Sequence, residues 1–124
     1  MRARIPFLGL AAFLALVAAA PAHAEGSITF INESPWTILA VYISPSSSSS
    51  WDDDLLGLVG LLSAHGGTFT KTDLTCTSYD IKLIDEQADE CVVRSYHICN
   101  EDKVWHMSRD WLLRCQGYRP GSRG

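Results

Sequence analysis

Four cysteines constrain this chain more than any other feature. They are Cys76, Cys91, Cys99 and Cys115, all in the second half of a chain of 124 residues. Whether they form cross-links depends on the compartment, because disulfides persist in oxidising surroundings and are rare in the cytosol. The N-terminal segment indicates in which of these two compartments the chain folds.

The first 24 residues have the pattern of an export signal. Met1-Arg2-Ala3-Arg4 is positively charged, residues 5–20 are almost all apolar, and Pro21-Ala22-His23-Ala24 ends in the small residues that signal peptidase accepts. We expect cleavage after Ala24 and export to the periplasm or the medium, with no membrane span in the mature chain. Cleavage leaves 100 residues with a net charge of −6, since the leader takes two arginines and no acid with it.

The size and charge of the mature chain exclude several classes of protein. About 100 residues suffice for one core, whereas a doubly wound nucleotide-binding sheet or an α/β barrel needs more chain. A net negative charge disfavours a general grip on a phosphate backbone, so we expect no nucleic-acid partner. We predict a cleaved signal peptide at 1–24, a single β domain at 25–118 and a flexible tail at 119–124.

In an oxidising compartment, four thiols predict two disulfides with three possible pairings. Residues 80–84 and 91–98 are strand-like and are joined by a polar link, 85–90, which predicts a hairpin. If the turn is centred on the middle of that link, Cys76 lies opposite Cys99 and within disulfide reach. A turn displaced by one residue would spoil this opposition.

The second disulfide follows from distance. Cys91 and Cys99 would lie on one strand about 26 Å apart, which leaves Cys91 to pair with Cys115. A metal site is not predicted, because the chain has no Cys-x-x-Cys pair and only His97 lies near a cysteine in the sequence. We expect His97 to share a strand face with Cys91 and Cys99.

The remaining segments predict further short strands separated by turns. The strand-like segments are 27–32, 36–43, 68–72 and 103–107, and Ser108 is expected to cap a short helix that carries Trp111, Leu112 and Leu113. Segment 36–43 is apolar on both faces, which predicts an interior strand. The fold class is therefore all-β: a small antiparallel β-sandwich or barrel of about six short strands, with a short C-terminal helical turn and two disulfides.

Several motifs resemble those of a family of small exported bacterial proteins. They are Ser44-Pro45-Ser46, Trp51-x-x-Asp54-Leu55-Leu56-Gly57, Cys76-x-x-Tyr79-Asp80-Ile81 and a strand that ends at Cys99. The similarity runs from Ile28 to about Cys99. Asp52 replaces a glycine expected in that family, and Ala64-His65-Gly66-Gly67 replaces an expected Pro-Gly turn. Because the family has no established activity, the resemblance implies a β fold and export, and no catalytic residue.

A polar loop, 44–54, contains the candidate binding residues, which are Ser46, Trp51, Asp52, Asp53 and Asp54. Trp51 ends a hydrophilic segment beside three acids, which is typical of an aromatic contact residue. The three aspartates offer oxygen ligands to Ca²⁺, although consecutive residues rarely converge on one ion. The alternative is that Asp54 caps the turn that follows it.

The sequence predicts no enzyme. It has no Gly-x-Ser-x-Gly motif, and thiols held in disulfides are not nucleophiles. We predict a non-catalytic binding or envelope-associated module whose partner is another envelope or extracellular protein. The alternatives are a carbohydrate-binding module, an inhibitor of a secreted hydrolase, and a small hydrolase that uses His65, His97 or His106.

Overall fold

The computed structural model describes residues 25–57 and 60–119. The predicted leader, 1–24, and residues 120–124 of the predicted tail lie outside the described residues. The elements in chain order are β1 (Gly26–Asn32), β2 (Ile38–Pro45), β3 (Gly67–Leu74), β4 (Thr77–Asp85), β5 (Glu90–Ile98), β6 (Asp102–Met107) and α1 (Arg109–Cys115). Within the described ranges, no helix is long and apolar enough to cross a membrane.

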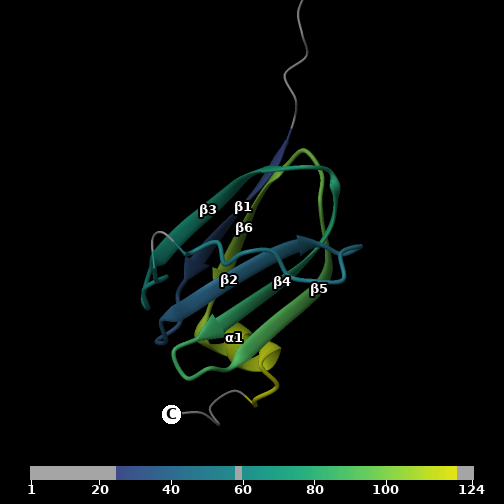
Figure 1. Ribbon diagram of the computed structural model, residues 1–124. Coiled ribbons are helices and arrows are strands. Elements are labelled where there is room, and N and C mark those ends of the chain that lie inside the picture. The colour runs from purple at the N-terminus through teal and green to yellow at the C-terminus, as the bar shows by residue number, and fades with distance from the viewer. Residues whose placement is uncertain (1–24, 58–59, 120–124) are drawn as a thin grey trace, which may run out of the picture.

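The six strands form two three-stranded sheets that lie one behind the other (Figure 1). One sheet has the strand order β3-β1-β6 and the other β2-β4-β5. The predicted fold class is confirmed: residues 25–57 and 60–119 are mostly β, with six strands, one short helix and two disulfides.

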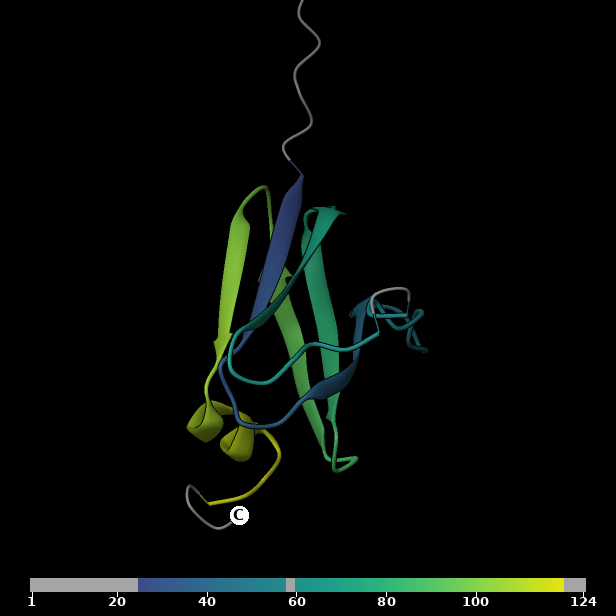
Figure 2. The ribbon, with the colours of Figure 1, turned by 90° about the vertical axis from the view of Figure 1, so that its left-hand side faces the viewer.

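One strand pair is parallel, which the prediction of an antiparallel sheet missed. β6 runs beside β1 in the same direction, with Thr29 opposite Val104. The reason is the connection from β5, which brings the chain back to the end of the molecule where β1 begins (Figure 2). There the amide of Ser27 donates to the carbonyl of Glu101 at 2.9 Å.

The core lies between the two sheets and follows from alternation along the strands. In β1, Ile28 and Phe30 are fully buried, while Ser27 and Thr29 lie on the opposite, partly exposed face. The facing sheet contributes Val41, Ile81 and Leu83. Each large apolar side chain buried in this way stabilises the fold by about 1.5–3 kcal/mol.

Helix α1 closes one end of the sandwich (Figure 1). It begins as predicted at Ser108, whose hydroxyl accepts a hydrogen bond from the amide of Trp111 at 3.1 Å. Leu112 and Leu113 are fully buried against the core. A disulfide between Cys115 and Cys91 ties the helix to the start of β5.

Both predicted disulfides, Cys76–Cys99 and Cys91–Cys115, are confirmed. The hairpin turn, however, is displaced from its predicted centre, because Ile84 pairs with Glu90. A bulge corrects the displacement: between the pairs Tyr79–Tyr96 and Ile81–Val93, β5 contains one more residue than β4. The extra residue restores the opposition that joins Cys76 to Cys99.

The same bulge overturns the expectation that His97 shares a face with both Cys91 and Cys99. Cys91 is fully buried and points into the core, whereas His97 is exposed. One inserted residue reverses the side to which all later side chains of a strand point. His97 therefore lies beside Cys99 on the outer side, away from Cys91.

β2 is an edge strand of its sheet, so the prediction of an interior strand was wrong. Its free edge is covered by the chain that follows. Ile38 exchanges backbone hydrogen bonds of 3.0 and 2.9 Å with Leu62, and the amide of Leu55 donates to the carbonyl of Val41 at 2.7 Å. The segment that follows β2 thus occupies its free edge, while the side chain of Leu39 stays exposed.

Asn32, at the end of β1, holds the connections on either side of β2 together. Its side chain is fully buried. Its amide nitrogen donates to the carbonyls of Trp36 at 2.8 Å and Leu62 at 3.0 Å, and its oxygen accepts from the hydroxyl of Ser34 at 2.7 Å. Removing this amide would leave several buried polar groups without a partner.

We therefore expect Asn32→Ala to lower the free energy of unfolding by about 2–4 kcal/mol in urea denaturation of the oxidised protein. The exposed loop residue Ser49 provides the control, since Ser49→Ala should change stability by no more than about 0.5 kcal/mol. Equal effects of the two substitutions would contradict the role of Asn32.

Candidate functional site

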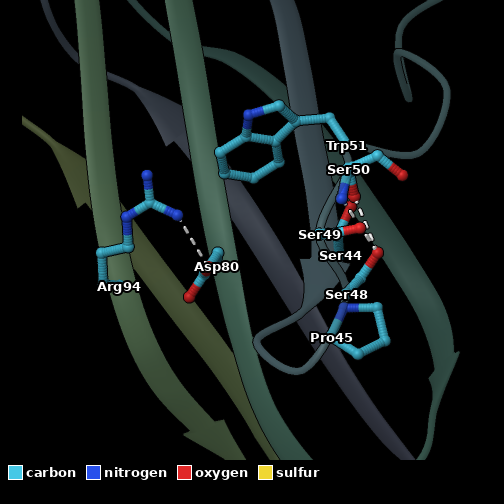
Figure 3. A pocket seen from close by; sticks show the side chains of 8 residues that line it. All are labelled: Ser44, Pro45, Ser48, Ser49, Ser50, Trp51, Asp80 and Arg94. Carbon is cyan, nitrogen blue, oxygen red and sulfur yellow. Dashed lines mark hydrogen bonds and ion pairs between the residues drawn. The ribbon is translucent and has the colours of Figure 1, made fainter.

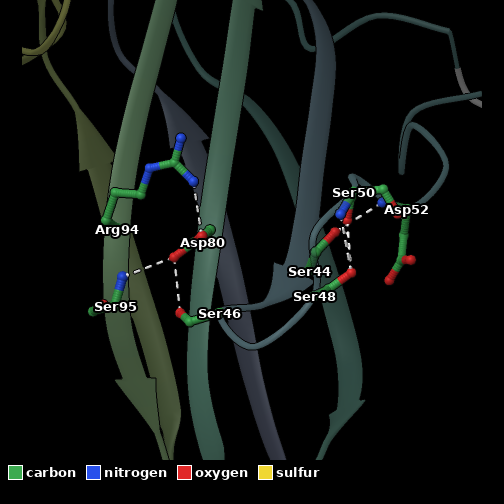
Figure 4. Close-up of polar contacts among 8 residues, drawn as sticks. All are labelled: Ser44, Ser46, Ser48, Ser50, Asp52, Asp80, Arg94 and Ser95. Atoms are coloured by element: carbon green, nitrogen blue, oxygen red, sulfur yellow. Dashed lines mark hydrogen bonds and ion pairs between the residues drawn. The ribbon is translucent and has the colours of Figure 1, made fainter.

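Residues Ser44–Asp54, here called the serine loop, leave the end of β2 and are held by their own polar groups. The amide of Asp52 donates to the hydroxyl of Ser44 at 2.8 Å, and the hydroxyl of Ser48 donates to the carbonyl of Ser50 at 2.9 Å (Figure 4). At its end, one carboxylate oxygen of Asp54 accepts from the amide of Val41 at 2.8 Å. The loop is thus fastened to β2 at both ends.

Trp51 lies over the outer face of the β2-β4-β5 sheet. Its ring centre is 6.4 Å from that of Tyr42. The ammonium of Lys82 is 4.9 Å from the Tyr42 ring centre and 5.1 Å from that of Trp51, and the guanidinium of Arg94 is 5.7 Å from Trp51. Cations at these distances are attracted to aromatic faces. Trp51 is half-buried by these contacts.

Asp80 joins the serine loop to the bulge of β5. One of its oxygens accepts from the amide of Ser95 at 3.0 Å and from the hydroxyl of Ser46 at 2.8 Å, and the other accepts from the guanidinium of Arg94 at 2.9 Å (Figure 4). Ser95 has a φ of 57°, in the left-handed region. The bulge interrupts the regular strand pairing, and the Asp80 carboxylate opposite it supplies the acceptor for the amide of Ser95.

These contacts favour the charged form of Asp80. The amide of Ser95 and the hydroxyl of Ser46 hold the pKa of the carboxyl below its ordinary value, and Arg94 adds to the effect. Burial of the side chain opposes the shift without reversing it. Asp80 is therefore an ionised group within the candidate site.

A hollow of about 130 Å³ lies between the serine loop and the strands (Figure 3). It is lined on one side by Pro45, by Trp51 and by the hydroxyl-bearing residues of the loop, and on the other side by Asp80 and Arg94. The side chain of Arg94 is 66% exposed even though it is paired with Asp80. The hollow therefore offers an aromatic ring, hydroxyls and a cation to a group that enters from solvent.

The five predicted binding residues do not all line the hollow. Trp51 lines the hollow, and Ser46 supports it through Asp80. Asp52 and Asp53 are exposed, and Asp54 is directed toward β2. The sequence does not predict Lys82 and Arg94 as site residues, and it indicates Asp80 only as a further oxygen ligand for calcium. Their positions around Trp51 depend on strand pairing and on the bulge.

The structure favours the capping alternative for Asp54 over a calcium ligand. The same oxygen that binds the amide of Val41 also accepts from the amide of Leu56 at 3.0 Å. Among the described residues, the three aspartates do not form a group of converging ligands. The sequence predicts no cofactor, and calcium at Asp52, Asp53 and Asp54 stays the weaker alternative to that prediction.

A second hollow, of about 300 Å³, lies where β5 faces β6 at the open side of the sandwich. These two strands edge different sheets and are not paired with each other. The hollow is lined by apolar and aromatic residues and one histidine: Val93, Tyr96, Val104, Trp105, His106 and Trp111. The ring of Trp105 packs 4.9 Å from that of Tyr96 and 5.5 Å from that of Trp111.

The three predicted histidines occupy different places. His65 lies in the turn before β3 with a φ of 60°. His106 is 3.0 Å from a carboxylate oxygen of Glu33, on the outer side of the other sheet. His97 lies 3.4 Å from the hydroxyl of Ser78, and among the hydrogen bonds of the described residues none joins its ring to a carboxylate. A serine–histidine pair of this kind lacks the acid that orients the base in hydrolases.

The fold and the cross-links define a small disulfide-stabilised β domain. No family model matches the chain, and no curated protein matches it. Among solved structures, the chain is similar to an NMR structure of a protein from Eubacterium rectale, with a TM-score of 0.50 and 10% sequence identity over 73% of this chain and 84% of that one. At this identity the similarity extends to the fold alone.

The lowered pKa of Asp80 predicts a pH-dependent contribution to stability. Because the pKa is lower in the folded state, ionised Asp80 stabilises the fold above the unfolded-state pKa, near 3.8, and this stabilisation is lost as the pH falls through the folded-state pKa. We expect Asp80→Asn to be less stable than the natural protein at pH 7, and the difference to shrink below about pH 4. Urea denaturation at several pH values measures the difference in free energy of unfolding between the two proteins. A difference that does not change with pH would contradict the role of the charge.

Proposed function

We propose that this protein is an exported, non-catalytic binding module that contacts another envelope or extracellular protein through the serine loop. Two disulfides support an oxidising environment for the folded protein. The predicted signal peptide supports export to such an environment.

The arrangement of Trp51 carries this proposal. A tryptophan at the end of a serine-rich loop is held between Tyr42, Lys82 and Arg94 and still lines a hollow open to solvent. Interface hot spots are enriched in tryptophan, tyrosine and arginine. Because the loop is fastened by hydrogen bonds before a partner arrives, little conformational freedom is lost on binding.

The size of the hollow favours a protein partner over a small molecule. Its volume of about 130 Å³ is below the range of about 300–1,000 Å³ that is typical of small-molecule sites. A single side chain of a partner fits such a space. A glycan is the second candidate, because the hollow between β5 and β6 reaches about 300 Å³ and is lined by three aromatic rings.

Affinity capture tests the proposal. The oxidised protein without its leader is immobilised and exposed to an envelope and culture-supernatant extract, and the affinity of any captured protein is then measured in purified form. We expect Trp51→Ala to weaken that affinity at least about tenfold, because it removes a central aromatic contact.

Leu61→Ala is the matched control, because Leu61 is a large apolar side chain that is 57% exposed and lies outside the serine loop. It should leave the affinity unchanged. Unchanged binding by a folded Trp51→Ala protein would contradict the proposed surface. Binding that a free sugar displaces would favour the glycan candidate.

A further inference from the structure

Three potential metal ligands meet at the end of the β4–β5 hairpin. The sulfurs of Cys76 and Cys99 and a ring nitrogen of His97 all lie within 4.8 Å of one another. Cys76 and His97 are exposed, and Cys99 is half-buried. The sequence places Cys76 opposite Cys99, and His97 two residues before Cys99, but it predicts no metal site there.

The two disulfides differ in their access to solvent. Cys91 is fully buried in the core beside α1, whereas Cys76 is exposed. Reduction by a thiol requires a thiolate to reach one of the two sulfurs. Cys115 is half-buried, so both sulfurs of Cys91–Cys115 are less accessible than that of Cys76. Cys76–Cys99 is therefore the bridge that a limited amount of a dithiol reductant attacks first.

The hairpin keeps the three ligands in place after reduction. The neighbouring residues Thr77 and Ile98 are paired across the strands, and Ser78 is paired with His97. Ile98 is fully buried, and the contacts of Asp80 hold the bulge. Because none of these interactions involves the sulfurs of Cys76 and Cys99, the two thiols remain opposite each other.

We propose that the reduced hairpin end is a zinc site formed by Cys76, Cys99 and His97. Zinc binds two thiolates and an imidazole at about 2.3 and 2.0–2.1 Å, which places the ligand atoms roughly 3.5–3.8 Å apart. Small side-chain rotations bring the three atoms to these distances. The exposed position of the group leaves the fourth coordination site to water.

The zinc site forms in two steps, reduction of the disulfide and binding of the metal. A dithiol reductant supplies two electrons to the Cys76–Cys99 bond and becomes a disulfide itself, and the two sulfurs of the protein become thiols. Zinc then binds the two thiolates, and their protons are released to solvent. The oxidised protein lacks both thiolates and has no such site.

The test compares zinc binding by the oxidised and the selectively reduced protein. A limited amount of dithiol is added and removed without air, and alkylation followed by mass spectrometry identifies the reduced cysteines. We expect Cys76 and Cys99 to be alkylated, Cys91 to be protected, and one Zn²⁺ per reduced chain to bind in calorimetry. Co²⁺ in place of Zn²⁺ should give the visible spectrum of tetrahedral cobalt with thiolate ligands.

His97→Ala separates the proposed site from adventitious binding to thiols. This substitution of an exposed side chain should weaken zinc binding at least about tenfold, since it removes one of three protein ligands. His106→Ala, which changes an exposed histidine on the other sheet, should leave it unchanged. The proposal is overturned if the folded, reduced protein binds no zinc, if His97→Ala binds it equally well, or if selective reduction unfolds the hairpin.

Discussion

The hydrogen bonds of the Asp80 carboxylate hold the candidate site together. One side chain on the middle strand of its sheet binds the amide of Ser95, the guanidinium of Arg94 and the hydroxyl of Ser46. It thereby connects the bulge of β5 to the start of the serine loop. The groups that Asp80 binds favour its ionised form, and the ionised carboxylate in turn holds these groups in place.

The bulge determines what each face of the β2-β4-β5 sheet presents. Before it, Cys91 points into the core and forms the buried disulfide to α1. After it, His97 and Cys99 lie on the outer side of the sheet. Trp51 packs over the same sheet beside Lys82 and Arg94. Without the inserted residue, Cys76 and Cys99 would not face each other. A local irregularity thus allows two disulfides at opposite ends of one hairpin.

Much of the fold could be predicted from the sequence, because alternation and capping are local signals. The strands, the Ser108 cap and both disulfides were predicted from residue patterns and spacing. The parallel pairing of β1 with β6 and the covered edge of β2 could not be, since both depend on where distant segments return. In the candidate site, Trp51 was visible as an aromatic in a polar loop. Asp80 and Arg94 were not, because only the bulge brings them together.

Amide hydrogen exchange of Asp80→Ala compared with the natural protein tests the central role of this carboxylate most directly. We expect the amides of Ser95 and of the serine loop to lose protection, because the acceptor for Ser95 and the anchor for Ser46 are gone. The amides of β1 and β6 in the other sheet should keep their protection. Unchanged protection at Ser95 and in the serine loop would show that Asp80 does not hold them, and a uniform loss across both sheets would show that its role is not local.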